Sequence, residues 1–400
     1  MKTRAGLCVL VAGVAAALAF PLAWPALFVD DSASYLVPAR SWAAGHGLRE
    51  GGRPMESRLP AYPLVLGLVI RAGGDDARWF GVANAVFHVA GMLVVALLLR
   101  RRAPGLVYAV CGLALVYPPF LTSTGMVLQE SLIAFLLAVV LALGWKALES
   151  PSPVLAFGTG LALGLATLAK VTALPLIVPL TLLMAATGPP RARRIALLWL
   201  GTVLAIAPWM VRNAREVGRF EIANNNAGLT FLGGTVSNEI ADWYGLPQYL
   251  SVREAWMAEN KGTAATLDRA LYGVGVRRIA ADPGRWLVLV GERVLRFMLP
   301  ARHWFVQSGR SRPASLGPWY LAALVLQVAL FASAAAVALR TWRRRGPWTH
   351  LLPPLIVFYH LAVYALSYVS PRYNVTVAPA LVACLLLALT TDRSPSPRSS

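Results

Sequence analysis

The feature that most constrains this chain is a series of long apolar segments separated by short polar connections. We expect ten of them to be helices, and several approach the roughly 20 residues that cross a bilayer. They cover residues 5–28, 79–99, 105–123, 127–147, 153–169, 171–188, 195–211, 318–339, 350–368 and 375–390. Only 14% of the residues are charged, whereas a soluble domain carries about 25%. The sequence therefore predicts an all-α polytopic membrane protein with about ten transmembrane helices.

The distribution of basic residues predicts the orientation of these helices. Short basic clusters lie at residues 100–102, 191–194 and 343–345, each between two apolar segments. If the segments alternate across the membrane with Lys2 and Arg4 inside, every such cluster falls on the cytoplasmic side, as the positive-inside rule requires. We thus expect a multi-pass protein of the bacterial inner (plasma) membrane. The net charge of +19 is spread over these loops and forms no contiguous face for nucleic acid, so no nucleic-acid partner is predicted.

We expect one transmembrane domain over residues 1–390, followed by a disordered cytoplasmic tail at 391–400 that is rich in serine and proline. Two long loops, about 29–78 and about 212–317, face outward. The first contains an apolar stretch at 62–70 that is too short to span, which favours a re-entrant or interfacial helix. In the second, the apolar residues of 285–299 recur at a helical period with charges between them, which predicts another interfacial helix.

Two adjacent carboxylates, Asp30 and Asp31, follow the first apolar segment at the outer membrane edge. A carboxylate beside a like charge at a low-dielectric boundary should bind its proton more tightly. Such a group suits a general base that takes a proton from a hydroxyl. A metal ligand, or simply a solvated helix end, is the alternative interpretation.

Further charged residues fall at the same outer level of the predicted topology. Each taken alone could be an interfacial anchor or a long side chain that reaches out of the membrane. Together they come from distant parts of the chain and could line a single pocket that handles a phosphate leaving group and a hydroxyl nucleophile. They are Glu130, Lys170, Arg212 and Arg372, which join Asp30 and Asp31. Arg58 and Tyr62, where the chain re-enters the interface, could hold a sugar or phosphate or form an interfacial anchor pair.

No metal or cofactor signature accompanies these residues. The three cysteines lie in apolar segments, and the five histidines have no ligand spacing. We expect that no cofactor is required. A divalent cation on Asp30 and Asp31 is compatible with the pattern.

Six short motifs occur in an order that is typical of one superfamily. The first four are Asp31-Ser32-Ala33-Ser34-Tyr35, the run from Arg58 to Pro63, Gln129-Glu130-Ser131 and Leu168-Ala169-Lys170; the last two are Pro208-Trp209-Met210-Val211-Arg212-Asn213 and Pro371-Arg372-Tyr373. In these motifs, over roughly residues 1–390, the chain resembles membrane glycosyltransferases of the GT-C fold. The nearest resemblance is to the dolichyl-phosphate-mannose protein mannosyltransferases (glycosyltransferase 39-like) and related bacterial enzymes.

The resemblance implies a transferase that moves a sugar from a polyprenyl-phosphate donor to an acceptor hydroxyl at the outer, periplasmic face. It implies that an aspartate after the first helix is the catalytic base, and the position relative to Tyr35 favours Asp31 over Asp30. We assign Arg372, Tyr373, Arg212, Lys170, Arg58 and Tyr62 to donor and phosphate binding, and Glu130 as a supporting acid. The acceptor could be a lipid, a glycan or a protein. The alternative function is a transporter or flippase of lipid-linked sugars, but that class typically shows repeated helices and charges near mid-membrane.

Overall fold

The computed structural model describes residues 2–24, 26, 28, 31–150, 152–187, 189, 191–222, 227–239, 251, 264–300 and 318–390. All ten predicted segments coincide with helices. These are α1 (Thr3–Ala23), α4 (Ala77–Leu99), α5 (Pro104–Leu115) with α6 (Pro118–Thr124), α7 (Glu130–Glu149), α8 (Pro153–Ala169), η1 (Val171–Leu176) with α9 (Ile177–Ala186), α10 (Arg191–Glu216), α15 (Pro318–Arg343), η4 (Trp348–Leu351) with α16 (Leu352–Leu366), and η5 (Pro371–Val377) with α17 (Ala378–Thr390). Among the described residues, seven helices are long and apolar enough to cross a membrane, or eight if α5 and α6 form one bent span. The helix α8 and the η1–α9 pair are apolar but shorter.

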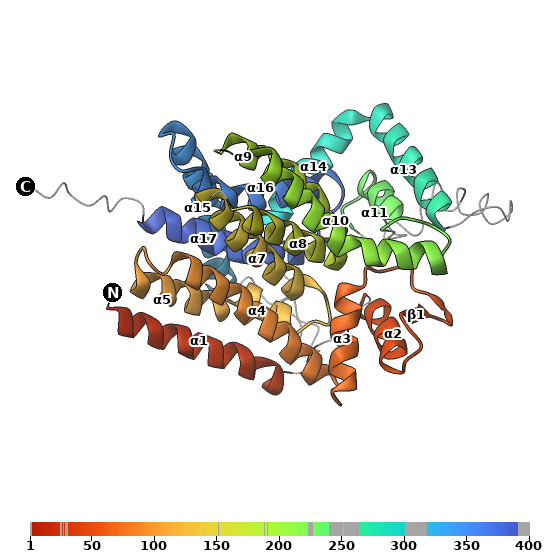
Figure 1. Cartoon of the computed structure of the whole chain (residues 1–400), viewed down its shortest axis with the longest axis horizontal. Coiled ribbons are helices and arrows are strands. Elements are labelled where there is room, and N and C mark those ends of the chain that lie inside the picture. The colour runs from red at the N-terminus through yellow and green to blue at the C-terminus, as the bar shows by residue number, and fades with distance from the viewer. Residues whose placement is uncertain are drawn as a thin grey trace, which may run out of the picture.

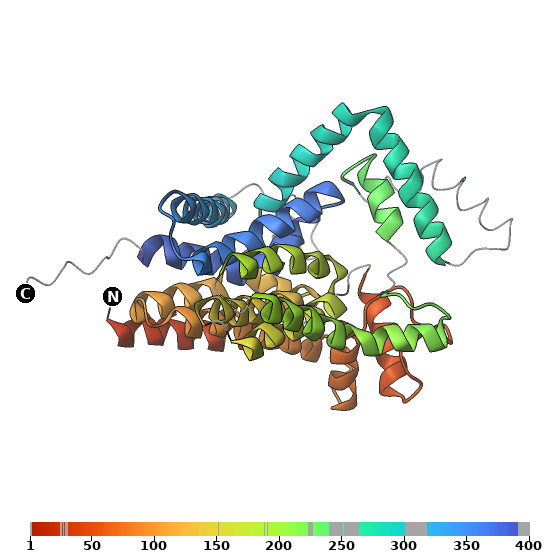
Figure 2. The same cartoon turned by 45° about the horizontal axis from the view of Figure 1, so that its top comes forward.

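Most of these helices run side by side along the long axis of the molecule, whereas α15 runs across it (Figures 1 and 2). The helix α1 begins and α17 ends at one end, on the left of Figure 1. The elements of the two long loops lie at the other end, which we call the site end (Figures 1 and 2). They are α2 (Ser32–Ala43), a hairpin of β1 (Arg49–Glu50) and β2 (Arg53–Pro54), α3 (Ala61–Arg71), α11 (Ala227–Gly234), α13 (Ala264–Ala281) and α14 (Pro283–Met298).

Small residues let neighbouring helices approach closely, as is common where lipid surrounds both partners. At the contact of α8 with α10, a Cβ atom added to Gly160 would lie 2.0 Å from the carbonyl oxygen of Leu198. Thr202 reinforces this contact by donating its hydroxyl to the Gly160 carbonyl at 3.1 Å. The contact of α1 with α5 is equally tight, because a Cβ on Gly6 would lie 2.1 Å from the Gly105 carbonyl oxygen.

The structure differs from the sequence prediction at several places, and proline explains two of them. The helix α1 ends at Ala23 rather than at 28, since the residue before Pro25 is disfavoured in helical geometry. The predicted 105–123 helix is broken before Pro118, where α5 and α6 meet at 58°. The helix α2 was not predicted, because it buries only a narrow stripe, including Tyr35 and Ala39, and lies within a polar loop.

The two predicted interfacial segments are both helices. The helix α3 buries Tyr62 and Leu66 on one face. The helix α14 buries Leu289, Arg293 and Phe297, four residues apart, on one face. The predicted tail at 391–400 and the candidate Asp30 lie outside the described residues.

Candidate active site

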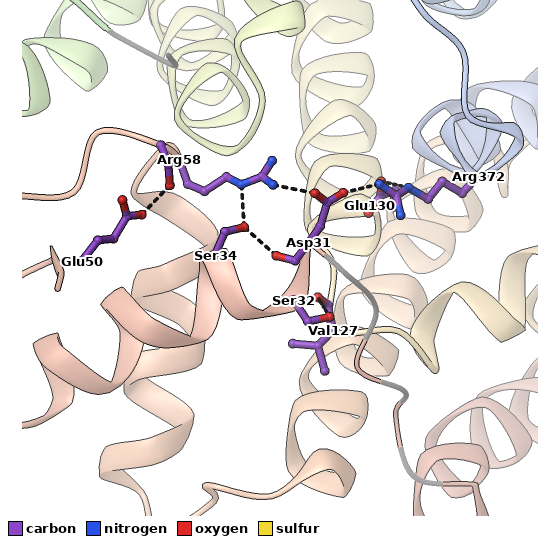
Figure 3. Close-up of polar contacts among 9 residues, drawn as sticks. Asp31, Ser32, Ser34, Glu50, Arg58, Val127, Glu130 and Arg372 are labelled. Carbon is purple, nitrogen blue, oxygen red and sulfur yellow. Dashed lines mark hydrogen bonds and ion pairs between the residues drawn. The ribbon is translucent and has the colours of Figure 1, made fainter. Parts of the chain in front are cut away.

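Asp31 lies between two arginines from opposite ends of the chain (Figure 3). Its Oδ1 accepts a hydrogen bond from Arg58 Nη2 at 2.6 Å, and its Oδ2 accepts one from Arg372 Nη2 at 2.6 Å. The sequence prediction that this carboxylate binds its proton more tightly is wrong: burial alone would raise the pKa of Asp31, but the charges and hydrogen bonds of the two arginines outweigh burial and hold the pKa below its usual value. Asp31 is therefore a carboxylate at neutral pH, and its side chain is still 37% exposed toward solvent.

The residues after Asp31 fix its position at the start of α2. Ser34 donates its hydroxyl to the Asp31 carbonyl at 2.6 Å and accepts a hydrogen bond from Arg58 Nε at 2.7 Å (Figure 3). Ser32, which is buried, donates to the carbonyl of Val127 at 3.1 Å. These local bonds tie the carboxylate to α2 and to the chain just before α7, as expected of hydroxyl side chains at a helix start.

The Arg58 guanidinium packs against an aromatic side chain. Its guanidinium lies 4.7 Å from the ring centroid of Tyr35, which is 2% exposed. Tyr62 packs edge-on against Tyr35 with centroids 5.2 Å apart. The Tyr62 hydroxyl donates to Asn84 Oδ1 at 3.2 Å, so it faces the helix α4 and not Asp31.

Arg372 connects Asp31 to a second acid. Its Nε lies 3.3 Å from Oε1 of Glu130, the first residue of α7, and the Glu130 side chain is 5% exposed. Within the described part of the chain, Glu130 Oε2 has no hydrogen-bond partner. The Arg372 guanidinium therefore faces two carboxylates and is fixed in a narrow range of orientations.

Lys170 occupies the break between α8 and η1. Its Nζ lies 3.6 Å from the ring centroid of Tyr373 and 4.9 Å from that of Tyr364. Of the residues that the structure describes, none provides a hydrogen-bond acceptor for this buried Nζ. An ammonium group held only by aromatic faces retains three unused donors.

These residues line one cavity of about 410 Å³ at the site end. Its charged residues are Asp31, Arg58, Glu130, Lys170 and Arg372, and its aromatic residues are Tyr35, Phe231, Tyr272, Tyr364, Tyr368 and Tyr373. Six of the residues predicted from the sequence are thus brought together, and the size suits a small-molecule site. Most of the aromatic residues were not singled out, because a tyrosine at a membrane edge reads the same whether it faces lipid or a pocket.

Arg212 does not line this cavity. It donates to the carbonyls of Met55 at 2.9 Å and Leu48 at 3.1 Å, and it forms an ion pair with Glu216 at 3.2 Å. Its guanidinium stacks 4.6 Å from the Trp209 ring centroid. In this position Arg212 fastens the segment that leads to Arg58 onto the end of α10.

No group of three histidine, cysteine, aspartate or glutamate side chains with the arrangement of a metal site occurs among the described residues. Both acids of the cavity, Asp31 and Glu130, face arginine. The cavity has three cationic and two anionic side chains, an excess of positive charge that favours a singly charged anion.

No protein-family model and no curated protein matches the sequence. Solved structures do match. The oligosaccharyltransferase AglB from Archaeoglobus fulgidus superposes with a TM-score of 0.55 in its apo form at 15% identity, over 97% of this chain and 51% of AglB. A complex of AglB with an inhibitory peptide and a dolichol-phosphate gives a TM-score of 0.54 at 15% identity, over 97% of this chain and 50% of AglB. ArnT from Cupriavidus metallidurans, bound to undecaprenyl phosphate, gives 0.47 at 16% identity, over 96% of this chain and 77% of ArnT.

The chain spans about half the length of AglB, and at this identity the likeness concerns the fold. The helical architecture and its apolar spans agree with that fold, as the order of the sequence motifs implied. This chain is a multi-pass membrane protein of the GT-C fold.

Proposed function

We propose that this protein is an integral-membrane glycosyltransferase that moves a sugar from a polyprenyl-phosphate donor to an acceptor hydroxyl. The observation that carries the proposal is the Asp31 carboxylate held between Arg58 and Arg372, in one cavity with Lys170 Nζ, for which the described residues provide no hydrogen-bond acceptor. Carboxylate and cations together provide a base and an anion site. AglB, which shares the fold, has been solved in complex with a dolichol-phosphate, and this supports a lipid phosphate as the donor's leaving group.

The donor phosphate is assigned to Lys170 and Arg372, with Arg58 and Tyr373 beside them. Lys170 Nζ has donors that no described residue uses, and Arg372 presents a forked guanidinium. Both come from the site end, close to where the apolar helices end, so a lipid tail can remain in the bilayer while its phosphate reaches the cavity. Charge-assisted hydrogen bonds at this place stabilise the phosphate as negative charge develops on it.

Asp31 is the group assigned to activate the acceptor. The acceptor hydroxyl donates its proton to Asp31 while its oxygen forms a bond to the anomeric carbon. The bond between that carbon and the phosphate oxygen breaks, and the lipid phosphate leaves with the electron pair. A single displacement of this kind through an oxocarbenium-like state inverts the anomeric centre. The scheme requires no cofactor, since Lys170 and Arg372 supply positive charge, and it is compatible with a divalent cation at Asp31.

The proposal includes an orientation in which the cavity lies outside the cytoplasm of a bacterial cell. The short basic clusters lie at the opposite end of the helices from the cavity, and such clusters favour the cytoplasmic side. The donor would then enter from the outer leaflet of the inner membrane. The acceptor, whether lipid, glycan or protein, would reach the cavity from the aqueous side.

Mass spectrometry of lipid-linked sugars and envelope glycans tests the proposal. Cells without the gene should accumulate one polyprenyl-phosphate sugar and lack one glycosylated product. Complementation with Asp31→Asn should fail to restore the product, while Asp75→Asn, which breaks the exposed 2.9 Å pair with Arg40 away from the cavity, should restore it. If Asp31→Asn restores the product fully, Asp31 is not the base. A lipid-linked sugar that accumulates only on the cytoplasmic side would indicate a flippase.

A further inference from the structure

The helix α14 contacts both flanks of the segment that carries Arg372, although some 70 residues separate them in sequence. On the first flank, Arg293 donates through Nη1 to the carbonyl of Ala365 at 3.0 Å, near the end of α16. On the second flank, Asn374 donates through Nδ2 to the carbonyls of Phe297 and Leu299, each at 3.2 Å. Figure 2 shows α14 reaching down to this part of the chain. The residues between 365 and 374 are therefore bracketed by one helix of the long outer loop.

Arg293 is an unusual residue to find in such a place, because it is fully buried. Besides Ala365, it donates to Asn238 Oδ1 at 2.7 Å and to the carbonyl of Gly234. Each of these acceptors is a neutral oxygen, and two of them are carbonyls at helix ends, which have no partner within their own helix. A buried guanidinium costs free energy to desolvate and is retained where several hydrogen bonds offset that cost. Arg293 thus acts as a clamp, by which we mean a buried side chain that joins α14 to the ends of α11 and α16.

The same clamp joins two walls of the cavity. Gly234 ends α11, whose residues Thr230 and Phe231 line the cavity. A Cβ atom on Gly234 would lie 1.9 Å from the Ser367 carbonyl oxygen, so α11 and the chain after α16 are in direct backbone contact. Arg293 holds both from one side. A shift of α14 must therefore move α11 and the Arg372 segment together.

We propose that Arg293 and Asn374 are positioning residues, through which α14 holds Arg372 within hydrogen-bond distance of Asp31 and sets the affinity for the donor phosphate. The role in donor affinity rests on the proposed function, whereas the role in holding Arg372 beside Asp31 does not. Arg372 places one guanidinium 2.6 Å from Asp31 and 3.3 Å from Glu130, and a turn free at both ends would not hold that arrangement. A displacement of about 1 Å at such a site can cost about a hundredfold in rate.

A matched control separates positioning from general stability. Arg194, at the opposite end of the molecule, is also fully buried and also serves two helix ends. It donates to the Ala147 carbonyl at 2.5 Å and to Thr187 Oγ1 at 3.2 Å, where α7 and α9 end. Arg194→Met should therefore lower stability by the same physical cause as Arg293→Met, without reaching the cavity.

The first test needs no ligand. In the full-length protein with Cys8, Cys111 and Cys384 changed to alanine, cysteines introduced by Asp31→Cys and Arg372→Cys are treated with a short bifunctional thiol reagent. The Asp31–Arg372 ion pair is then absent, so cross-linking reports how the backbone is held. We expect Arg293→Met and Asn374→Ala to lower the cross-linking rate several-fold, Arg293→Lys to restore it in part, and Arg194→Met to leave it unchanged. An unchanged rate in both Arg293→Met and Asn374→Ala, or an equal loss in Arg194→Met, refutes the proposal.

The second test measures binding of undecaprenyl phosphate to the protein with its native cysteines, in nanodiscs. Arg293→Met and Asn374→Ala should weaken binding about tenfold, as expected when a supporting contact of a site is lost, and Arg194→Met should not. If these variants lose cross-linking but bind the lipid as the unmodified protein does, donor affinity is not set by α14 and that half of the proposal is refuted. If the unmodified protein fails to bind the lipid phosphate while the cross-linking pattern holds, the role of α14 in holding Arg372 beside Asp31 is supported and the donor class of the proposed function is wrong.

Discussion

Replacing Arg58 by methionine should raise the pKa of Asp31 and so move the acid limb of the pH–rate profile to higher pH. The two arginines hold the pKa of Asp31 below its usual value. In the unmodified protein, kcat/KM for the proposed transfer should therefore stay level through the pH range in which an ordinary aspartate takes up its proton. Without Arg58 the carboxylate should take up its proton at higher pH, where it ceases to be a base.

The size of the shift follows from the geometry of the pair. Two unit charges about 4 Å apart attract by about 4 kcal/mol at an effective dielectric constant of about 20. Asp31 is 37% exposed and Arg58 is 18% exposed, so solvent screens the pair. Fully exposed pairs contribute only about 0.2–1 kcal/mol. Between these limits we expect the pair to contribute about 1.4 kcal/mol, and its loss raises the pKa of Asp31.

The assay is kcat/KM against pH, with purified protein and the donor that mass spectrometry identifies. Arg40→Met is the control, since Arg40 pairs with Asp75 at 2.9 Å on the exposed surface and lies outside the cavity lining. Its acid limb should coincide with that of the unmodified enzyme. An Arg58→Met profile that also coincides would refute the electrostatic coupling, even if its plateau is lower.

Three further predictions concern the anion site, the helix contacts and the bonds by which Arg212 holds the first loop. Lys170→Met should weaken undecaprenyl phosphate binding by about 1.5–3 kcal/mol, the usual contribution of a charged hydrogen bond, and titration in nanodiscs measures it. Gly160→Leu should lower the unfolding temperature strongly, because its Cβ would meet the Leu198 carbonyl at 2.0 Å, whereas Gly291→Ala in α14 faces open space and should gain about 1 kcal/mol; thermal unfolding followed by intrinsic fluorescence compares them. Arg212→Ala should lower the unfolding temperature and change the affinity for lipid phosphate little. A variant that loses binding at unchanged stability would place Arg212 in the donor site after all.

The membrane architecture was predictable because apolar length is a local property of the sequence. All ten segments and both interfacial helices, near 62–70 and 285–299, are helices. What was missed depends on local geometry. The helix breaks before Pro118 although the apolar sequence continues, so hydropathy does not reveal the break. The buried residues of α2 lie within a loop that is polar overall, so they give no clear helical pattern.

The meeting of Asp31 with Arg372, 341 residues apart, was predictable only as a shared level of the membrane. The depth of a residue in the predicted membrane topology does not determine which side of its helix the residue faces. Arg212 satisfies the level criterion and still binds the Met55 and Leu48 carbonyls instead of lining the cavity. Arg293 lies in a segment read as interfacial, where a buried arginine has no sequence signal.

The count of charges in the cavity has a consequence for turnover. Three cations and two anions give the empty cavity one positive charge in excess, equal and opposite to that of a phosphodiester. In the proposed transfer the diester becomes a monoester that gains a second negative charge, with a second pKa of about 6, while Asp31 gains a proton. The total therefore stays near zero across the chemical step. Once Asp31 gives up that proton to water, the cavity and the proposed product together carry one negative charge in excess, and this repulsion should favour release of the lipid phosphate.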